Sequence, residues 1–166
     1  RVRGEDAAAY LDYALVSKLS ELETSRAKYT IICNDQGGAI DDLIVYRMAD
    51  DEFLIVANAA NRHAVVVAMM ERQEKFANVE VLDESEDWAL IALQGPKSQA
   101  ILEALSAKDL SGAKYYSILE AQLSGVEVLL ARTGYTGEDG FEIFVPEEHA
   151  VTIWQLLISQ SEVKPS

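Results

Sequence analysis

Two adjacent carboxylates, Asp41 and Asp42, open an otherwise apolar stretch at residues 40–47, IDDLIVYR. Side chains alternate between the two faces of a strand, so this spacing predicts that the two carboxylates point in opposite directions. Asp42 would then share its face with Ile44 and Tyr46. A carboxylate there could orient a nitrogen-bearing ligand by hydrogen bonding, or accept a proton. An Asp at the start of a strand is also a common turn residue, and both interpretations stay open.

Glu142 is a third candidate, within the strand-like stretch FEIFV at residues 141–145. It is either a solvent-facing Glu on an alternating strand or a planar acceptor for two N–H groups of a heterocycle. The preceding residues 133–140, TGYTGEDG, form a Gly-rich loop that permits close backbone approach. They lack the GxxxxGK[ST] order of a phosphate loop, and a strand rather than a helix follows. Tyr135, within this loop, either stacks on a flat ligand or pins the loop.

Composition excludes several other functions. The chain carries 14 Lys and Arg against 28 Asp and Glu, a net charge of −14, so it lacks the basic surface of a nucleic-acid or anionic-membrane binder. His63 and His149 have no Cys or His at ligand spacing, so we expect no metal site. Cys33 is the single cysteine, which excludes an internal disulfide.

Short strands and helices must position these residues. The 166 residues are 49% apolar and 25% charged, the composition of a globular chain that can bury a core. Asn58 precedes the second predicted helix and is placed to cap it. Strands are predicted at 28–33, 40–47, 52–57, 78–83, 88–93, 115–123, 126–132 and 141–145, and helices at 5–16, 59–75, 95–105 and 146–159.

The order of these elements repeats along the chain, which predicts an internal duplication with units at 1–84 and 85–166. Paired strands need an apolar cover, so we expect each sheet to carry helices on one face. Chance similarity is the alternative. In this alignment Glu127 is equivalent to Asp42, so the two carboxylate side chains could point into one cleft. The matched segments are Arg3-Gly4 with Gln94-Gly95, Tyr29-Thr30-Ile31 with Tyr116-Ser117-Ile118, Asp42 to Arg47 with Glu127 to Arg132, and residues 53–56 with 141–144.

Four segments carry a resemblance to a known family: CNDQGGAIDDLIVYR, FLIVANAANR, ALIALQGPKSQAIL and RTGYTGEDGFEIFVP. Together they resemble the aminomethyltransferase, or T-protein, of the glycine cleavage system, over essentially all 166 residues. The resemblance implies an α+β fold of two pseudo-repeated ferredoxin-like units, antiparallel sheets covered by helices, without the family's C-terminal barrel-like domain. The DDL strand lies in the first unit and the GYTGEDG loop in the second, and together they form a folate-binding module. We expect both ends of the chain to be domain boundaries.

The resemblance implies transfer of a one-carbon unit from the aminomethyl-lipoyl H-protein to tetrahydrofolate, with release of ammonia, in glycine degradation. By motif match Asp42 is the catalytic aspartate, which orients the reactive ring nitrogens of the folate. Glu142 would hold the amino and ring N–H groups of the pterin. The lipoylated H-protein is the expected partner, and no nucleic acid, membrane or metal is expected. A bacterial cytoplasm is the implied location, with the mitochondrial matrix left open. Further positions that line the family's folate pocket are Tyr29, Tyr46, Asn58, Tyr116, Glu127 and Tyr135.

Related functions share this fold and remain alternatives: a folate-dependent demethylase, the folate domain of a sarcosine-type dehydrogenase, or a non-transferase iron–sulfur assembly module. The hallmark of the last, a K-G-C-x-x-G-Q-like motif, is not visible. The DDL and GYTGEDG blocks favour aminomethyl transfer. We expect these 166 residues to fold but not to turn over, because the second repeat lacks a counterpart of strand 78–83 and the family's folate-contacting arginine falls beyond Ser166.

Overall fold

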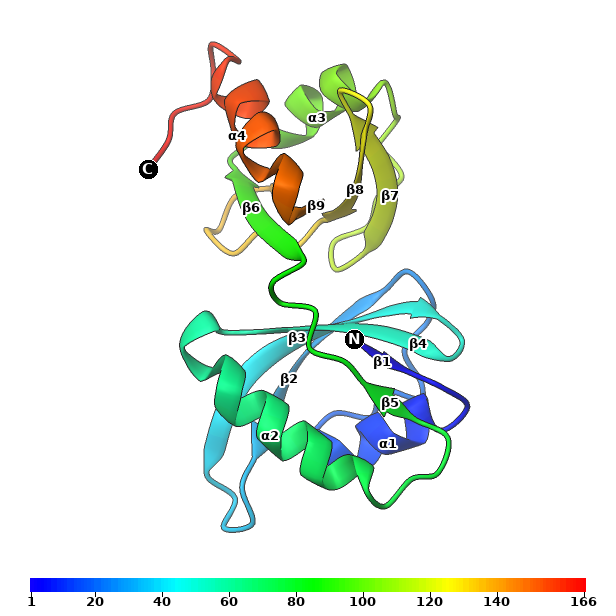
Figure 1. The fold of residues 1–166 in the computed structure, drawn as a ribbon. Coiled ribbons are helices and arrows are strands. Elements are labelled where there is room, and N and C mark those ends of the chain that lie inside the picture. The colour runs from blue at the N-terminus through cyan, green and yellow to red at the C-terminus, as the bar shows by residue number, and fades with distance from the viewer. The chain divides into compact units, whose positions relative to one another are not determined.

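The computed structural model describes all 166 residues as two compact units, unit 1 (Arg1–Asp83) and unit 2 (Glu84–Ser166), shown in Figure 1. Each unit is one antiparallel sheet with helices packed on one face, which confirms the α+β fold class. Unit 1 contains β1 (Val2–Arg3), α1 (Ala7–Ala14), β2 (Ala27–Cys33), β3 (Ala39–Ala49), β4 (Glu52–Ala57), a 3-10 turn (Ala59–Asn61), α2 (Arg62–Gln73) and β5 (Glu80–Val81). Unit 2 contains β6 (Trp88–Gln94), α3 (Ser98–Ser106), β7 (Ile118–Leu123), β8 (Val126–Ala131), β9 (Gly140–Pro146), a 3-10 turn (Glu147–His149) and α4 (Ala150–Ile158).

The two sheets share one topology. The strand order is β2-β3-β4-β1-β5 in unit 1 and β6-β9-β8-β7 in unit 2, so β6 to β9 correspond to β1 to β4. Three consecutive strands lie between the two helices of each unit, where the ferredoxin-like β-α-β-β-α-β motif has two. The repeated connectivity supports a duplication.

One face of each sheet carries the core. In unit 1, Leu43 and Val45 of β3 pack with Tyr10 of α1 and Met69 of α2, and all four are buried. Their β3 neighbours one residue away lie on the opposite face because strand side chains alternate. This alternation places Asp41 on the helix-covered face and Asp42 on the helix-free face, as the sequence predicts.

A glycine turns the chain at the same point in both units. Gly4 after β1 and Gly95 after β6 have φ of 125° and 124°, which side chains with a Cβ rarely adopt. Their N–H groups donate to the carbonyl oxygens of Asp51 (2.9 Å) and Asp139 (2.7 Å), respectively. At Gly4 a Cβ would also lie 2.2 Å from the Asn78 carbonyl oxygen. The predicted match of Arg3-Gly4 with Gln94-Gly95 is therefore confirmed.

The predicted match of Tyr29 with Tyr116 is wrong. Tyr116 has φ 58° and donates its N–H to the Arg132 carbonyl (2.9 Å), and in unit 1 Ser25, with φ 63°, donates in the same way to Arg47 (2.8 Å). Tyr116 is thus the counterpart of Ser25. Ser25 and Tyr116 both lie 21 residues after the equivalent glycines Gly4 and Gly95, and a Tyr-(Thr/Ser)-Ile string reflects strand propensity rather than equivalence.

Two further differences concern short elements. The repeated order of elements predicts a strand before the first helix, but the bounds of β1 were not predicted, because two residues are too few to show an alternating pattern. The strand predicted at 78–83 contracts to Glu80–Val81, and it pairs with β1 at Val2↔Val81. None of the helices combines the length and apolar composition needed to cross a bilayer.

Strand β6 is an edge strand, whereas its counterpart β1 is paired on its second side by β5. The bonds Gly95 N–H to Asp139 O and Glu147 N–H to Asp87 O set which β6 residues face β9. In an antiparallel pair the bonded residues alternate, so Ile91 and Leu93 face β9 while the N–H groups of Leu90 and Ala92 point to the open edge.

We therefore expect alternating amide exchange along β6. The amides of Leu90 and Ala92 should exchange about a hundredfold faster than those of Ile91 and Leu93, because only the latter are held by β9. Amide exchange followed by NMR measures this, and Arg3, whose strand is covered by β5, is the control. Uniform slow exchange along β6 would show that another strand covers this edge.

Candidate functional site

Asp42 is held on both carboxylate oxygens, on the face of the unit 1 sheet that carries no helices. The Tyr29 hydroxyl donates to Oδ2 (2.9 Å) and the Asn58 side-chain amide donates to Oδ1 (3.2 Å) and to the Asp42 carbonyl (3.1 Å). Asp42 is exposed and Tyr29 is 50% exposed. The structure thus brings three predicted site residues together around a carboxylate that solvent can reach.

Asp41 fastens the loop that follows β4. Its side chain, 4% exposed, accepts hydrogen bonds from the Asn58 backbone N–H (2.9 Å), the Asn58 side-chain amide (2.9 Å) and the Asn61 side-chain amide (2.7 Å). Burial raises the pKa of Asp41, but the hydrogen bonds from Asn61 and Asn58 outweigh it, and the pKa lies below its usual value. Asp41 therefore stays charged and holds Asn58 in place beside Asp42.

Asn58 does not cap a helix. It occupies the position before the 3-10 turn at Ala59–Asn61, but its side chain makes no capping hydrogen bond. A cap would use the side-chain oxygen to accept a helix N–H, whereas here the amide nitrogen donates to Asp41 and Asp42. Asn61 was not singled out by the sequence analysis; its place in the NAAN segment, three residues after Asn58, is the only signal for it.

Tyr46 is buried on the same face as Asp42, four residues further along β3. It lies opposite Ala27 of β2 and Leu54 of β4. The predicted common face of Asp42 and Tyr46 is therefore confirmed, but Tyr46 does not join the hydrogen bonds around Asp42 that are described above.

Glu142 lies half-buried in the middle of β9, between Ala92 of β6 and Ala131 of β8. The buried Thr133 hydroxyl donates to its Oε2, and no donor from unit 2 meets its second oxygen. The interpretation as a freely solvated Glu is therefore not what the structure shows. Thr133, which the sequence analysis did not single out, opens the TGYTGEDG motif.

Tyr116 lies within electrostatic reach of Glu142. Burial raises the pKa of Tyr116, and the nearby Tyr115 and Glu142 raise it further, so its hydroxyl stays protonated and can donate. The Tyr115 ring packs edge-on against Tyr116 at 4.8 Å, and its hydroxyl donates to the Gly134 carbonyl (2.8 Å). Tyr115 was also not predicted; the tandem Tyr115-Tyr116 is the signal that marks it.

Glu127 and Tyr135 are not gathered around Glu142. Glu127 is exposed at the start of β8, four residues or about 13 Å along the strand from Ala131, which pairs with Glu142. Glu127 does occupy the position equivalent to Asp42. Ile44, two residues after Asp42, pairs with β4, and Leu129, two residues after Glu127, pairs with β9, the counterpart of β4. Tyr135 is 68% exposed in the loop.

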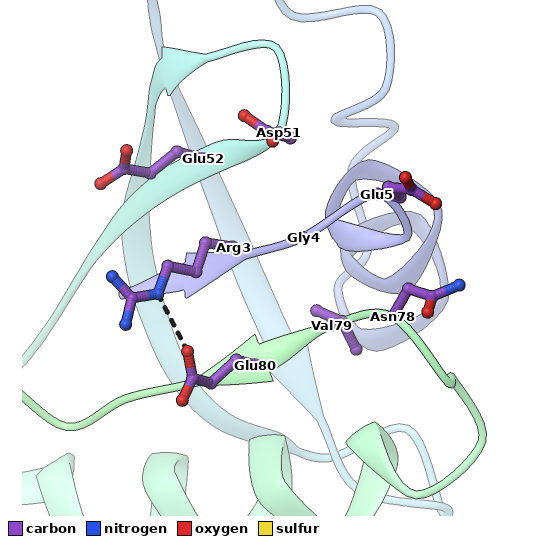
Figure 2. Close-up of a pocket in the computed structure, with 8 residues that line it drawn as sticks. All are labelled: Arg3, Gly4, Glu5, Asp51, Glu52, Asn78, Val79 and Glu80. Atoms are coloured by element: carbon purple, nitrogen blue, oxygen red, sulfur yellow. Dashed lines mark hydrogen bonds and ion pairs between the residues drawn. The ribbon is translucent and has the colours of Figure 1, made fainter.

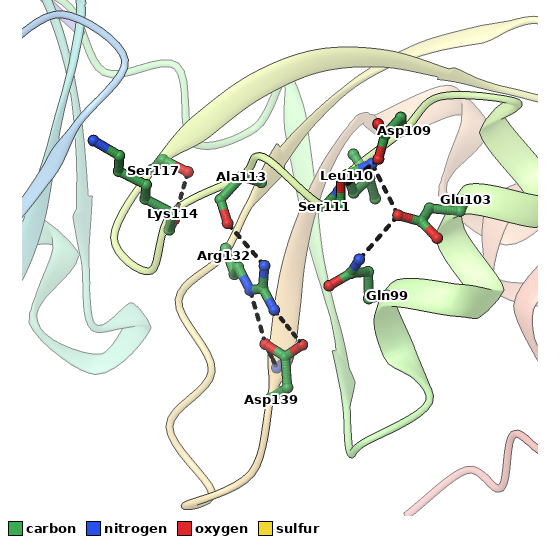
Figure 3. Close-up of polar contacts among 11 residues, drawn as sticks. Gln99, Glu103, Asp109, Leu110, Ser111, Ala113, Lys114, Ser117, Arg132 and Asp139 are labelled. Atoms are coloured by element: carbon green, nitrogen blue, oxygen red, sulfur yellow. Dashed lines mark hydrogen bonds and ion pairs between the residues drawn. The ribbon is translucent and has the colours of Figure 1, made fainter.

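The loop at residues 133–139 closes tightly at its base. A Cβ on Gly134 would lie 2.8 Å from the Gly140 backbone nitrogen, so only glycine fits there. The Arg132 guanidinium donates to both oxygens of Asp139 (3.0 and 2.7 Å) and to the Ala113 carbonyl (2.8 Å), as Figure 3 shows. The two ends of the loop are thus tied directly to each other.

Unit 1 also has an open depression of about 580 Å³ where β1, β4 and β5 meet, drawn in Figure 2. Arg3 pairs with Glu80 there (2.9 Å), and no predicted site residue lines it. Its acidic wall and lack of aromatic rings suit neither a pterin nor its anionic tail. Its lining residues are Arg3, Gly4, Glu5, Asp51, Glu52, Asn78, Val79 and Glu80. In neither unit do three or more His, Cys, Asp or Glu side chains gather as metal ligands would.

The fold is a duplicated α+β domain that carries the carboxylates described above. Sequence comparison identifies its family. Residues 1–165 match the family profile described as the GCVT N-terminal domain, so the chain belongs to this family. It is 49% identical over 161 residues to an aminomethyltransferase of Streptomyces coelicolor (97% of this chain, 43% of the relative). It is 51% identical over 158 residues to one of Saccharopolyspora erythraea (95% and 42%). The chain thus spans less than half the length of these curated relatives.

Structural comparison agrees with this assignment. The glycine cleavage system aminomethyltransferase T from Bartonella henselae superposes with a TM-score of 0.86 at 33% identity, over 98% of this chain and 43% of that one. The heterotetrameric sarcosine oxidase from Corynebacterium sp. U-96 has a TM-score of 0.68 at 20% identity, over 99% and 81%, which is a likeness of fold. The resemblance to T-proteins in the sequence is therefore confirmed.

Proposed function

We propose that this domain is the folate-binding part of an aminomethyltransferase that transfers the one-carbon unit of aminomethyl-lipoyl H-protein to tetrahydrofolate and releases ammonia. The observation that carries the proposal is the exposed Asp42 carboxylate, fixed by Tyr29 and Asn58. Relatives named aminomethyltransferase at about half identity support it. The H-protein is the proposed partner and the bacterial cytoplasm the proposed location.

The two carboxylates fit tetrahydrofolate. A carboxylate has about four lone-pair sites, and Asp42 uses two of them for Tyr29 and Asn58, which leaves capacity for a ring nitrogen. One oxygen of Glu142 is taken by Thr133, and the other is available for a pterin N–H group. When bound, tetrahydrofolate supplies the nitrogen nucleophile that accepts the one-carbon unit.

Each residue then has a defined task. Asp42 accepts a hydrogen bond from the reacting nitrogens at its carboxylate and orients them. Asn58 and Tyr29 prevent rotation of that carboxylate. Glu142 binds the amino and ring N–H groups of the pterin, which sets the orientation of the ring without touching the transferred carbon. Tyr116, kept protonated, offers a donor beside Glu142.

The alternative enzymes share the fold, and the fold alone does not favour them. The likeness to sarcosine oxidase rests on 20% identity, whereas the aminomethyltransferase relatives reach 49 to 51%. Aminomethyl transfer is therefore the function we adopt.

The test is ammonia release from aminomethylated H-protein with tetrahydrofolate, in an aminomethyltransferase of the relatives' length that carries this domain. We expect turnover that requires both substrates, and far less from the 166-residue chain. Turnover of dimethylglycine or sarcosine instead would replace the proposal with the demethylase alternative.

Substituting Glu142 by Gln should weaken tetrahydrofolate binding at least tenfold in the same enzyme, because the charge-assisted acceptor is lost while Thr133 can still donate. Isothermal titration calorimetry measures the affinity. Glu148→Gln, at an exposed position just beyond β9, is the matched control and should leave the affinity unchanged. Equal affinity in the Glu142 variant and the wild type would make Glu142 a structural residue of the sheet.

A further inference from the structure

Arg132 joins the two strands that flank the TGYTGEDG loop. Its backbone is fixed by two bonds, N–H to the Ser117 carbonyl (2.9 Å) and carbonyl to the Tyr116 N–H (2.9 Å). Its guanidinium stacks over the Phe141 ring at 5.5 Å and forks onto Asp139. Arg132 therefore contacts Asp139, the last residue before β9, and Phe141 within β9.

Asp139 is itself held on several sides. Its carbonyl accepts the Gly95 N–H (2.7 Å), and its Oδ1 accepts the Gly140 N–H (3.0 Å) as well as the Arg132 Nε–H. The arginine side chain is 20% exposed and the aspartate 28%, so the pair is largely shielded from solvent. Asp139 directly precedes β9 and lies three residues before Glu142. Its bonds to Arg132 therefore fix where β9 begins.

Unit 1 has the same arginine without the loop. Arg47 is the counterpart of Arg132 and stacks over Phe53 at 5.4 Å. It donates to the carbonyls of Leu22 (2.7 Å) and Asp50 (2.8 Å), and meets the Asp50 carboxylate only at 3.9 Å. A short turn follows Arg47, whereas the glycine loop follows Arg132. The close carboxylate pair therefore belongs to the unit that carries the loop.

We propose that Arg132 and Asp139 are positioning residues, which fix the base of the loop at residues 133–139 and thereby hold Thr133 against Glu142. Thr133 follows Arg132 directly, and its hydroxyl can reach Glu142 only while β8 and β9 keep their spacing at this point. The effect on ligand rests on the proposed function of Glu142, whereas the effect on the loop does not.

The experiment compares Arg132→Lys and Asp139→Asn with the matched control Arg47→Lys. Lysine keeps the charge but cannot reproduce the fork onto two carboxylate oxygens together with the bond to Ala113. Amide exchange by NMR on the 166-residue chain reports the loop. Calorimetry with tetrahydrofolate, in the longer enzyme, reports the ligand site.

We expect both unit 2 variants to speed amide exchange at Gly95 and Gly140, whose N–H groups bond to Asp139 at the base of the loop, about tenfold, and to weaken tetrahydrofolate about tenfold. The control should speed exchange only near residues 20–22 and 49–51 and leave the affinity unchanged. Unchanged exchange at Gly95 and Gly140 overturns the proposal, and so does faster exchange there with full affinity. If the wild type binds no tetrahydrofolate, the proposed function fails, and the exchange measurement alone decides whether Arg132 and Asp139 fix the loop.

Discussion

We expect replacement of Asp42 by Asn to lower kcat for the proposed aminomethyl transfer by about a hundredfold in the longer enzyme, the size expected for loss of a positioned charged group at the reacting atoms. Asparagine matches the shape of the side chain, and its oxygen can still accept from Asn58. It lacks the carboxylate charge that, in the proposed function, orients the ring nitrogen. Asp42 is exposed and lies outside the core, so the free energy of unfolding should hardly change. Steady-state kinetics of ammonia release measure the loss.

Two observations separate a role in turnover from a role in binding. The Asp42 variant should lose kcat with little change in tetrahydrofolate affinity, whereas the Glu142 variant should lose affinity. Tyr29→Phe, which removes one donor to Asp42 but keeps the ring, should cost several-fold in kcat. Full activity of Asp42→Asn would remove this residue from the reaction altogether.

We expect replacement of Asp41 by Ala to destabilise unit 1 by about 3 kcal/mol, because the amide donors of Asn58 and Asn61 lose their buried acceptor. Urea unfolding followed by far-UV circular dichroism measures the change. Asp35→Asn, at an exposed turn position in the same unit, is the control and should stay within about 0.5 kcal/mol of the wild type. A loss below that value for Asp41→Ala would mean that the two asparagines find other acceptors.

The contribution of Asp41 depends on pH with a defined sign. Its pKa in the folded state lies below the ordinary 3.8, so protons bind it more weakly in the folded chain than in the unfolded chain. The stabilisation is fully present above about pH 4 and is lost as the pH falls through the lower folded pKa. The stability difference between the wild type and Asp41→Asn should therefore be constant from pH 5 to 8 and shrink below pH 4.

Local patterns in the sequence identify much of the site. Alternation along residues 40–47 places Asp41 and Asp42 on opposite faces, and the structure confirms it. Periodicity also finds the four helices and the longer strands, because each depends on residues close together in the chain. For β1 only its place in the repeated order could be predicted and not its bounds, since a two-residue strand is defined by its partners rather than by its own pattern.

By itself, the sequence determined the α+β class, the repeated order of elements and the family. It also identified two carboxylates, Asp42 and Glu142, that interrupt apolar strands. The tertiary structure decided which side chains those carboxylates meet. Asn58 bonds to Asp41 and Asp42 instead of capping, and Thr133 bonds to Glu142 across the base of a loop. The reason is physical: a strand's face follows from alternation within it, whereas contacts between distant residues depend on sheet register and loop closure, which no local propensity encodes.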